Sequence, residues 1–164
     1  MDWINDQEVG LNSAGLSKIS ILIPVHNEQS YIAGCLKSVF AQDYPHNQME
    51  ILIADGNSDD ETVSIIKSLS SETQIPISII NNPQMIVPIG LNLLIPIARG
   101  DIIIRVDGHC IIEPNYVSNC VRHLQKDGVD GVGGPMRTVG EDLVSEVIAL
   151  AMSSKFGVGN SSFR

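Results

Sequence analysis

The stretch KISILIPV, residues 18–25, is a nearly continuous apolar run with the length of one β-strand. Runs of this kind are typical of strands that are buried on both faces of a sheet. The stretch EQSYIAGCLKSVFAQ, residues 28–42, then carries its apolar side chains at the spacing of an amphipathic helix, and Tyr44-Pro45 ends it. A buried strand followed by a helix is the repeating unit of α/β folds.

The same pattern continues toward the C-terminus. Further strands are predicted over residues 49–55, 76–81, 100–107 and 129–134. One helix is predicted after Ser58 as N-cap, opening with Asp59, Asp60 and Glu61. A second is predicted over 87–98, with entry at Pro88 and a disturbance at Pro96. Two more are predicted from Pro114 to about residue 125 and over 141–154. Such alternation implies a mostly parallel sheet flanked by helices. We therefore expect a polar lead-in, residues 1–17, and one α/β domain, residues 18–164.

Composition restricts the partners of the chain. The 19 Asp and Glu residues against 10 Lys and Arg give a formal net charge of -9, which argues against nonspecific binding to nucleic acid. The 3 cysteines form no CxxC pair and are odd in number, so we expect reduced thiols that fill the core in a cytoplasmic protein. The most apolar stretch, MIVPIGLNLLIPIA, is shorter than the roughly 20 residues that cross a bilayer.

Polar residues follow three of the predicted strands, as PVHNE (24–28), DGNSDD (55–60) and VDGHC (106–110). The carboxyl ends of parallel strands lie at one edge of a sheet, and ligands of open α/β sheets bind there. Asp, Asn and Gly are also common in turns that bind nothing, so each motif taken singly has that alternative. Three acidic strand ends at one edge favour a ligand site.

The turn after the first strand lacks the glycine-rich sequences that cradle phosphate in dinucleotide-binding and P-loop proteins. A phosphate ligand at this edge would therefore need another device, such as a divalent cation. Asp107 and His109 are the candidate metal ligands, two residues apart after a predicted strand. We expect Mn²⁺ or Mg²⁺, and a carboxylate with an imidazole suits Mn²⁺ somewhat better.

Four segments together make the sequence similar to a known family: ISILIPVHNEQSYIAGCLKSVFAQDYP, EILIADGNSDDET, GLN…ARGDIIIRVDGH and GNSSFR. Over residues 19–164 they resemble family 2 glycosyltransferases, in particular the branch of succinoglycan-type exopolysaccharide enzymes. The resemblance implies the Rossmann-like GT-A fold of nucleotide-diphospho-sugar transferases. It also implies a divalent cation and the inverting transfer of a sugar, with UDP as the first nucleotide to test, to a glycan or lipid-linked acceptor in polysaccharide biosynthesis.

The resemblance also implies roles for individual residues. His26 takes the place of the aromatic residue that packs on the base, Glu28 lies near the base or ribose, and Asp55 reads the base edge. Asp107 matches the first Asp of the family's DxD motif and His109 replaces the second. The remaining residues that we assign to the donor site by this resemblance are Pro24, Val25, Asn27, Asn57, Ser58, Asn92, Arg99, Arg105 and Gly108.

Asn92 and Arg99 fall in the segment that borders the donor diphosphate and sugar. Arg105 has two open interpretations, donor contact or structural pairing, because an unpaired guanidinium within a strand would be costly.

The catalytic base of the family usually lies in an ED motif that follows the GNSSFR segment. Glu141-Asp142 precedes that segment, so we assign no catalytic residue and expect the base beyond Arg164. The chain then corresponds to the donor-binding, N-terminal part of a longer enzyme, truncated at its C-terminus, that binds nucleotide without efficient transfer. We expect it in the cytoplasm, with any association with the inner face of the membrane made by later segments.

Two other classes share the alternating architecture. A nucleotidyltransferase would carry a glycine-rich, basic phosphate loop after the first strand, and PVHNEQ is not one. A non-catalytic receiver-like module would carry adjacent acids after the first strand and a lysine after the last, and VGGPMR offers no lysine. Both remain as alternatives to the glycosyltransferase.

Overall fold

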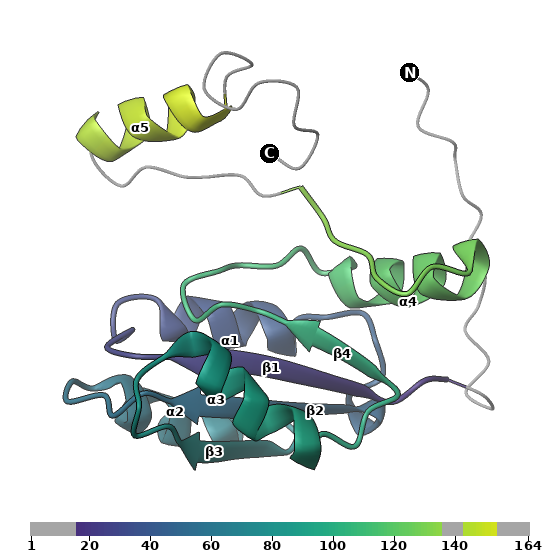
Figure 1. Cartoon of the computed structure of the whole chain (residues 1–164), viewed down its shortest axis with the longest axis horizontal. Helices are drawn as coiled ribbons and strands as arrows, with labels where there is room; N and C mark the ends of the chain where they lie inside the picture. Colours follow the sequence, from purple (N-terminus) through teal and green to yellow (C-terminus); the bar gives the residue numbers. More distant parts are fainter. Residues whose placement is uncertain (1–15, 136–142, 154–164) are drawn as a thin grey trace. The chain divides into compact units, whose positions relative to one another are not determined.

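The computed structural model describes residues 16–135 and 143–153, and Figure 1 shows the order of their elements. The strands are β1 (Ile19–Val25), β2 (Met49–Asp55), β3 (Ile77–Asn81) and β4 (Ile102–Arg105). The α-helices are α1 (Ile32–Phe40), α2 (Thr62–Leu69), α3 (Val87–Leu94), α4 (Tyr116–Asp127) and α5 (Leu143–Ser153). Short 3-10 turns cover 46–48, 70–72 and 95–97, so the helix after Pro88 does change its geometry at Pro96.

The four strands form one parallel sheet in the order β3-β2-β1-β4. β1 lies inside the sheet, where Ile21 pairs with Ile51 of β2 and Ile104 of β4. All seven residues of β1 are buried, which is why its sequence shows no alternation of apolar and polar residues. The predicted parallel α/β sheet is confirmed.

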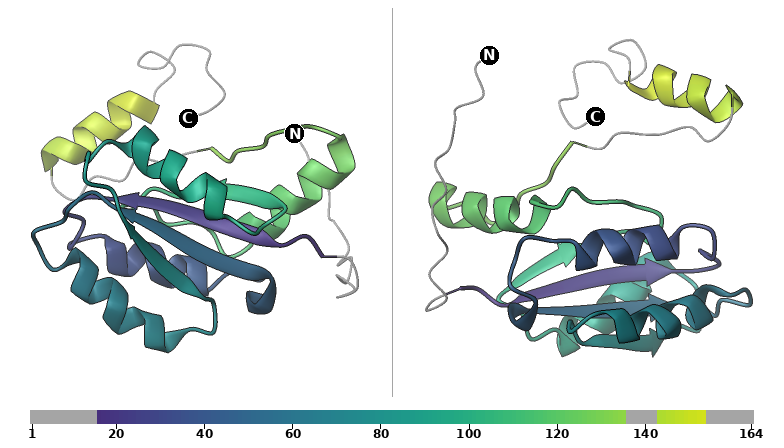
Figure 2. Two further views of the ribbon diagram at one scale, coloured as in Figure 1. Left: turned by 60° about the horizontal axis from the view of Figure 1, so that its bottom comes forward. Right: turned by 180° about the vertical axis from the view of Figure 1, so that it is seen from behind.

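Helices cover both faces of this sheet (Figures 1 and 2). Side chains of α1, α2 and α4 pack with Ile21 and Ile23 of β1 in the larger core. On the other face, Leu94 of α3 packs with Leu22 and Leu52 in a smaller one. Because successive strand residues point to opposite faces, β1 supplies both cores.

Two predicted helix starts are wrong, for one reason. The helices begin at Ile32 and Thr62, later than expected, and Ser58 is not the N-cap of α2. The loops that precede them are instead tied to each other: the Asn27 amide donates to Ser58 Oγ at 3.0 Å, and the Glu28 amide donates to Thr62 Oγ1 at 2.8 Å. Asp59, Asp60 and Glu61 belong to these linked loops and not to the first turn of α2.

The predicted strand over 129–134 is also wrong, since this segment has no regular structure and does not join the sheet. Val129 and Val132 are exposed, and nothing lies within 4 Å of the Cβ positions of Gly131 and Gly133. A glycine-rich segment without packing neighbours lacks the contacts that hold a strand.

The chain divides into two compact parts, residues 1–121 with the sheet and residues 122–164 with α5, so the single domain stays a prediction. Within the described ranges, every helix is too short or too polar to span a bilayer. Residues 1–15, 136–142 and 154–164 lie outside the described residues. Two stretches used in the sequence analysis fall there, Glu141-Asp142 and the GNSSFR segment.

Candidate functional site

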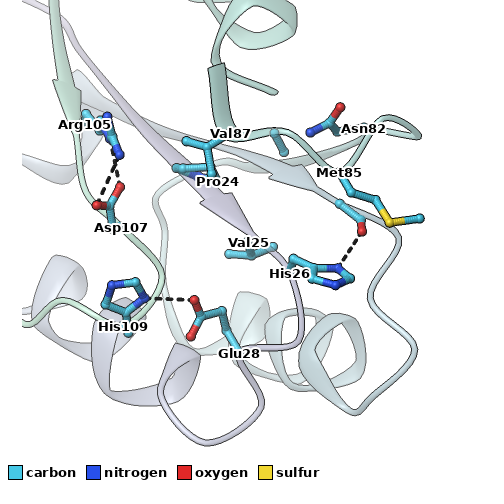
Figure 3. A pocket seen from close by; sticks show the side chains of 12 residues that line it. Pro24, Val25, His26, Glu28, Asn82, Met85, Val87, Arg105, Asp107 and His109 are labelled. Atoms are coloured by element: carbon cyan, nitrogen blue, oxygen red, sulfur yellow. Dashed lines mark hydrogen bonds and ion pairs between the residues drawn. The ribbon is translucent and has the colours of Figure 1, made fainter. Parts of the chain in front are cut away.

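A pocket opens at the carboxyl ends of β1, β2 and β4, beside the segment that joins β3 to α3 (Figure 3). This is the edge at which sequence motifs gathered and at which ligands bind in open α/β sheets. Its walls are of two kinds, one charged and one largely apolar. The lining residues are Pro24, Val25, His26, Glu28, Ala54, Gly56, Asn82, Met85, Val87, Arg105, Asp107 and His109.

One ion pair and one hydrogen bond form the charged wall. The Arg105 guanidinium donates from Nε to Asp107 Oδ1 at 2.8 Å and from a second nitrogen to Oδ2 at 3.2 Å. His109 Nδ1 lies 2.8 Å from Glu28 Oε1. An ionised carboxylate only accepts, so Nδ1 is the donor and the opposite nitrogen, Nε2, is left for a ligand. Both arrangements are open to solvent, with side-chain exposures of 54% for Arg105 and 57% for His109.

A tight turn brings together three side chains of types that can ligate a metal ion. The Cys110 amide donates to the Asp107 carbonyl at 2.9 Å, which closes the turn over residues 107–110. The ligand atoms of Asp107, His109 and Cys110 all lie within 4.8 Å of one another. The turn packs tightly at Gly108, where a Cβ would lie 3.0 Å from Val25 Cγ1 and 3.2 Å from Glu28 Cγ, so a larger residue would require these side chains to shift. A carboxylate, an imidazole and a thiol are a donor set that fits a divalent transition metal.

The thiols beside this turn are protonated in the absence of a metal. Burial, together with the Asp107 carboxylate, raises the pKa of Cys110. Burial raises the pKa of Cys35 to about 12, with smaller contributions from Cys110, Glu28 and Asp107. Cys35 Sγ donates to the Asp107 carbonyl at 3.5 Å, so it supports the turn from below.

The apolar wall is formed by Pro24, Ala54, Met85 and Val87, with His26 at its border (Figure 3). His26 Nδ1 lies 2.6 Å from the Gly56 carbonyl, which can only accept, so the ring is held with its Nδ1 protonated. This wall offers an apolar surface next to the charged one, and it is open to solvent at Met85, 53% exposed, and Val87, 41% exposed.

Asn82 lines the pocket beside this wall and is 3% exposed. Its Nδ2 donates to the Ile86 carbonyl at 3.1 Å, and its Oδ1 has no hydrogen-bond partner within the described residues. Sequence reasoning missed Asn82, Met85 and Val87. Their position directly after the third strand, at the same edge as the three motifs, was the available signal.

Several sequence-predicted residues lie at this edge but do not line the pocket. Asp55 Oδ1 accepts from the Ser58 amide at 3.2 Å. Asn27 and Asn57 adopt left-handed backbone conformations, each with φ of 54°, and Asn27 links the two loops described above. Through these hydrogen bonds and backbone conformations, the residues hold the loops around the pocket in place.

Asn92 and Arg99 are not brought to the pocket. Asn92 is exposed within α3. The Arg99 amide donates to Oε1 of Glu50 at 2.7 Å, and Glu50 is the second residue of β2. Arg99 therefore lies at the amino end of the strands, the edge of the sheet opposite the pocket.

Solved structures of glycosyltransferases share this architecture. The mannosyltransferase PcManGT from Pyrobaculum calidifontis, solved with GDP-Man and Mn²⁺, superimposes with a TM-score of 0.63 at 20% identity, covering 82% of this chain and 39% of that one. TarS (residues 1–349) from S. aureus superimposes with a TM-score of 0.61 at 21% identity, covering 74% and 39%. The fold is GT-A.

Sequence comparison identifies relatives at higher identity. A dolichyl N-acetyl-α-D-glucosaminyl phosphate 3-β-D-2,3-diacetamido-2,3-dideoxy-β-D-glucuronosyltransferase of Methanococcus voltae is 34% identical over 149 residues, 87% of this chain and 46% of the relative. The succinoglycan biosynthesis protein ExoA of Rhizobium meliloti is 32% identical over 146 residues, 88% and 44%. The chain spans less than half the length of each.

The profile described as Glycosyl transferase family 2 matches residues 20–159, which include the whole pocket and the four strands except Ile19, the first residue of β1. The resemblance inferred from the motifs is thereby confirmed, and the nucleotidyltransferase and receiver-like alternatives are not supported. This chain belongs to glycosyl transferase family 2.

Proposed function

We propose that the pocket binds the nucleotide-diphospho-sugar donor of a family 2 glycosyltransferase, with a divalent cation at Asp107 and His109. Transfer of the sugar with inversion, to a glycan or lipid-linked acceptor in polysaccharide biosynthesis, is the reaction that this donor site would serve. Similarity to the succinoglycan protein ExoA supports the polysaccharide assignment. TarS has been solved with UDP and with UDP-GlcNAc, and PcManGT with GDP-Man, which supports a nucleotide-sugar donor.

The observation that carries the proposal is the division of the pocket into two walls. A nucleotide-diphospho-sugar has a similar division, between a flat base and a negatively charged diphosphate. Met85 and Val87, with the ring of His26, suit the base, and the Arg105 side of the pocket suits the diphosphate. Asn82, whose Oδ1 lacks a hydrogen-bond partner among the described residues, would lie at the base end.

The cation would be held by a carboxylate oxygen of Asp107 and by Nε2 of His109. When bound, it would neutralise the charge that develops on the leaving nucleoside diphosphate. Glu28 is then a positioning residue, because its hydrogen bond to Nδ1 fixes the tautomer and orientation of the His109 ring. This differs from the contact with base or ribose that sequence reasoning assigned to Glu28.

The position of Arg105 is compatible with both interpretations left open by the sequence, structural pairing and donor contact. It is paired with Asp107, yet its side chain is half exposed and lines the pocket. We propose that it holds the Asp107 carboxylate in place before the cation binds and contacts the diphosphate afterwards.

A thermal-shift panel tests the donor site. UDP, GDP, CDP and TDP are each added with Mn²⁺, with Mg²⁺ or with a chelator. A ligand at about 100 times its Kd stabilises the folded state by about 2.7 kcal/mol, which raises Tm by about 5–10 °C for a domain of this size. We expect the largest shift with UDP and Mn²⁺, and its loss with chelator.

The absence of a shift with every nucleotide and cation would contradict the proposed donor site. A shift that is unchanged by chelator would leave nucleotide binding in place and contradict the role of the cation. A larger shift with GDP than with UDP would correct the nucleotide alone.

A further inference from the structure

The turn over residues 107–110 presents a third metal-binding atom that the proposed donor site does not use. In a turn closed by a hydrogen bond from the fourth residue to the first, the Cα atoms of those two residues lie less than about 7 Å apart. Here the first residue is Asp107 and the fourth is Cys110. The Cys110 sulfur accordingly lies within 4.8 Å of the ligand atoms of both Asp107 and His109.

The three cysteines of the chain differ in their burial and in whether they lie near Asp107 and His109. Cys35 is fully buried in the main core, and Cys120, 8% exposed, packs in the same core from α4. Cys110 is only partly buried. It is also the cysteine that belongs to the cluster of metal-binding side chains found among the described residues. The prediction that the cysteines fill the core describes Cys35 and Cys120 better than Cys110.

We propose that Cys110 Sγ is the third protein ligand of the cation, so that this site prefers thiophilic divalent ions such as Zn²⁺, Co²⁺ or Cd²⁺ over Mn²⁺ and Mg²⁺. The inference rests on the proposed function, since it extends the cation site of the donor pocket. As the metal–sulfur bond forms, the S–H bond breaks and its proton passes to the solvent buffer, so no oxidant or reductant is needed.

The preference follows from the chemistry of the ligands. Mg²⁺ takes oxygen ligands and keeps several waters, so a thiolate adds little to its binding. Soft thiolate favours Zn²⁺ and similar ions, and imidazole suits the later transition metals. Compared with an all-oxygen site, His109 in place of a carboxylate favours later transition metals. The added thiolate of Cys110 strengthens the same preference.

Cobalt(II) provides a direct test on the full chain, because a cobalt–thiolate bond produces a charge-transfer band in the near ultraviolet while any bound cobalt produces weaker visible bands. Wild type, Cys110→Ser, Cys120→Ser and Asp107→Asn are titrated with cobalt chloride alone. We expect the near-ultraviolet band in wild type and Cys120→Ser and its loss in Cys110→Ser. Circular dichroism verifies that each variant is folded.

Competition between Cd²⁺ and Mn²⁺ gives a second readout. We expect Cys110→Ser to lower the ratio of cadmium affinity to manganese affinity by about tenfold or more, and Cys120→Ser to leave it unchanged.

The outcomes separate this inference from the donor site itself. If cobalt binding requires Asp107 but gives no thiolate band, or if Cys110→Ser keeps the band, Cys110 is not a ligand and the donor site stands. If wild type and Asp107→Asn bind cobalt equally, or wild type binds none, both the cation site and the Cys110 ligand are wrong.

Discussion

Both edges of the sheet carry polar side chains, but these side chains make different kinds of contact. At the amino edge, Glu50 Oε1 accepts from Ser20 Oγ at 2.6 Å and from the Arg99 amide at 2.7 Å, and the Gly100 amide donates to Ser20 Oγ at 2.8 Å. At the carboxyl edge, the charged side chains of Arg105 and Asp107 pair with each other beside a pocket.

This difference separates polar side chains that stabilise the fold from polar side chains that are available to a ligand. At the amino edge, Glu50 and Ser20 accept hydrogen bonds from the backbone amides of Arg99 and Gly100, so these side chains stabilise the fold. The carboxyl-edge pairs join side chain to side chain in contact with solvent, where such pairs contribute little to stability and can be rearranged by a ligand. We therefore expect substitutions at the amino edge to change stability, and substitutions at the carboxyl edge to change binding.

The largest effect is expected for Gly100→Ala at the amino edge. A Cβ at this position would collide with the Ser20 amide nitrogen and lie 2.8 Å from the Ile19 carbonyl carbon, both backbone atoms of β1. We expect a loss of about 3 kcal/mol or more in the free energy of unfolding, measured by urea denaturation.

Gly34→Ala, within α1, is the matched control, because the added Cβ would lie at an ordinary contact distance of 3.8 Å from Ile111 Cδ1. We expect this change to be neutral or to stabilise the chain by up to about 1 kcal/mol. Equal stability of the two variants would refute the tight contact at the amino edge.

Asp107→Asn at the carboxyl edge should produce the opposite pattern. Loss of the charged ligand is expected to weaken Mn²⁺-dependent UDP binding by about a hundredfold or more, measured by calorimetry, with a change of less than about 1 kcal/mol in stability. Asp130→Asn, the same change at an exposed acid outside the pocket, serves as control. Unaltered UDP affinity in Asp107→Asn would remove Asp107 from the site.

A glutamate-to-glutamine change at each edge compares the two directly. Glu28→Gln weakens the orientation of His109, so we expect about a 10–100-fold loss of metal affinity with nearly unchanged stability. Glu50→Gln weakens two hydrogen bonds of the amino edge, so we expect a loss of about 1–2 kcal/mol in stability with unchanged metal affinity. Metal titration and urea denaturation of both variants measure the contrast, and the reverse pattern would break it.

The smallest effects are expected for the two arginines. Arg105→Ala removes a pocket cation beside Asp107, and we expect about a tenfold loss of UDP affinity, equal to about 1.4 kcal/mol. Arg99→Ala leaves the backbone amide that bonds Glu50 in place, and we expect less than about a twofold change. A loss in Arg99→Ala as large as in Arg105→Ala would restore the sequence-based assignment of Arg99.

Much of the fold could be predicted because burial leaves a direct pattern in the sequence. β1 is buried on both faces and reads as one apolar run, and its predicted end at Val25 is the observed one. The prediction over 129–134 was wrong because a valine and glycine pattern is compatible with a strand only where a neighbouring strand receives it. The helix starts at Ile32 and Thr62 were misplaced because hydrogen bonds between distant loops outweigh local capping preferences.

The sequence by itself determined the parallel α/β sheet, the family and the edge of the sheet at which the motifs gather, because periodicity and strand-end motifs are local properties. Tertiary structure alone decided which of those residues meet. Glu28 reaches His109 across 81 positions of sequence through the pairing of β1 with β4. Arg99, only eight positions before Asp107, lies at the opposite edge because β4 runs between them. Strand order and register set these distances, and neither can be read from neighbouring residues.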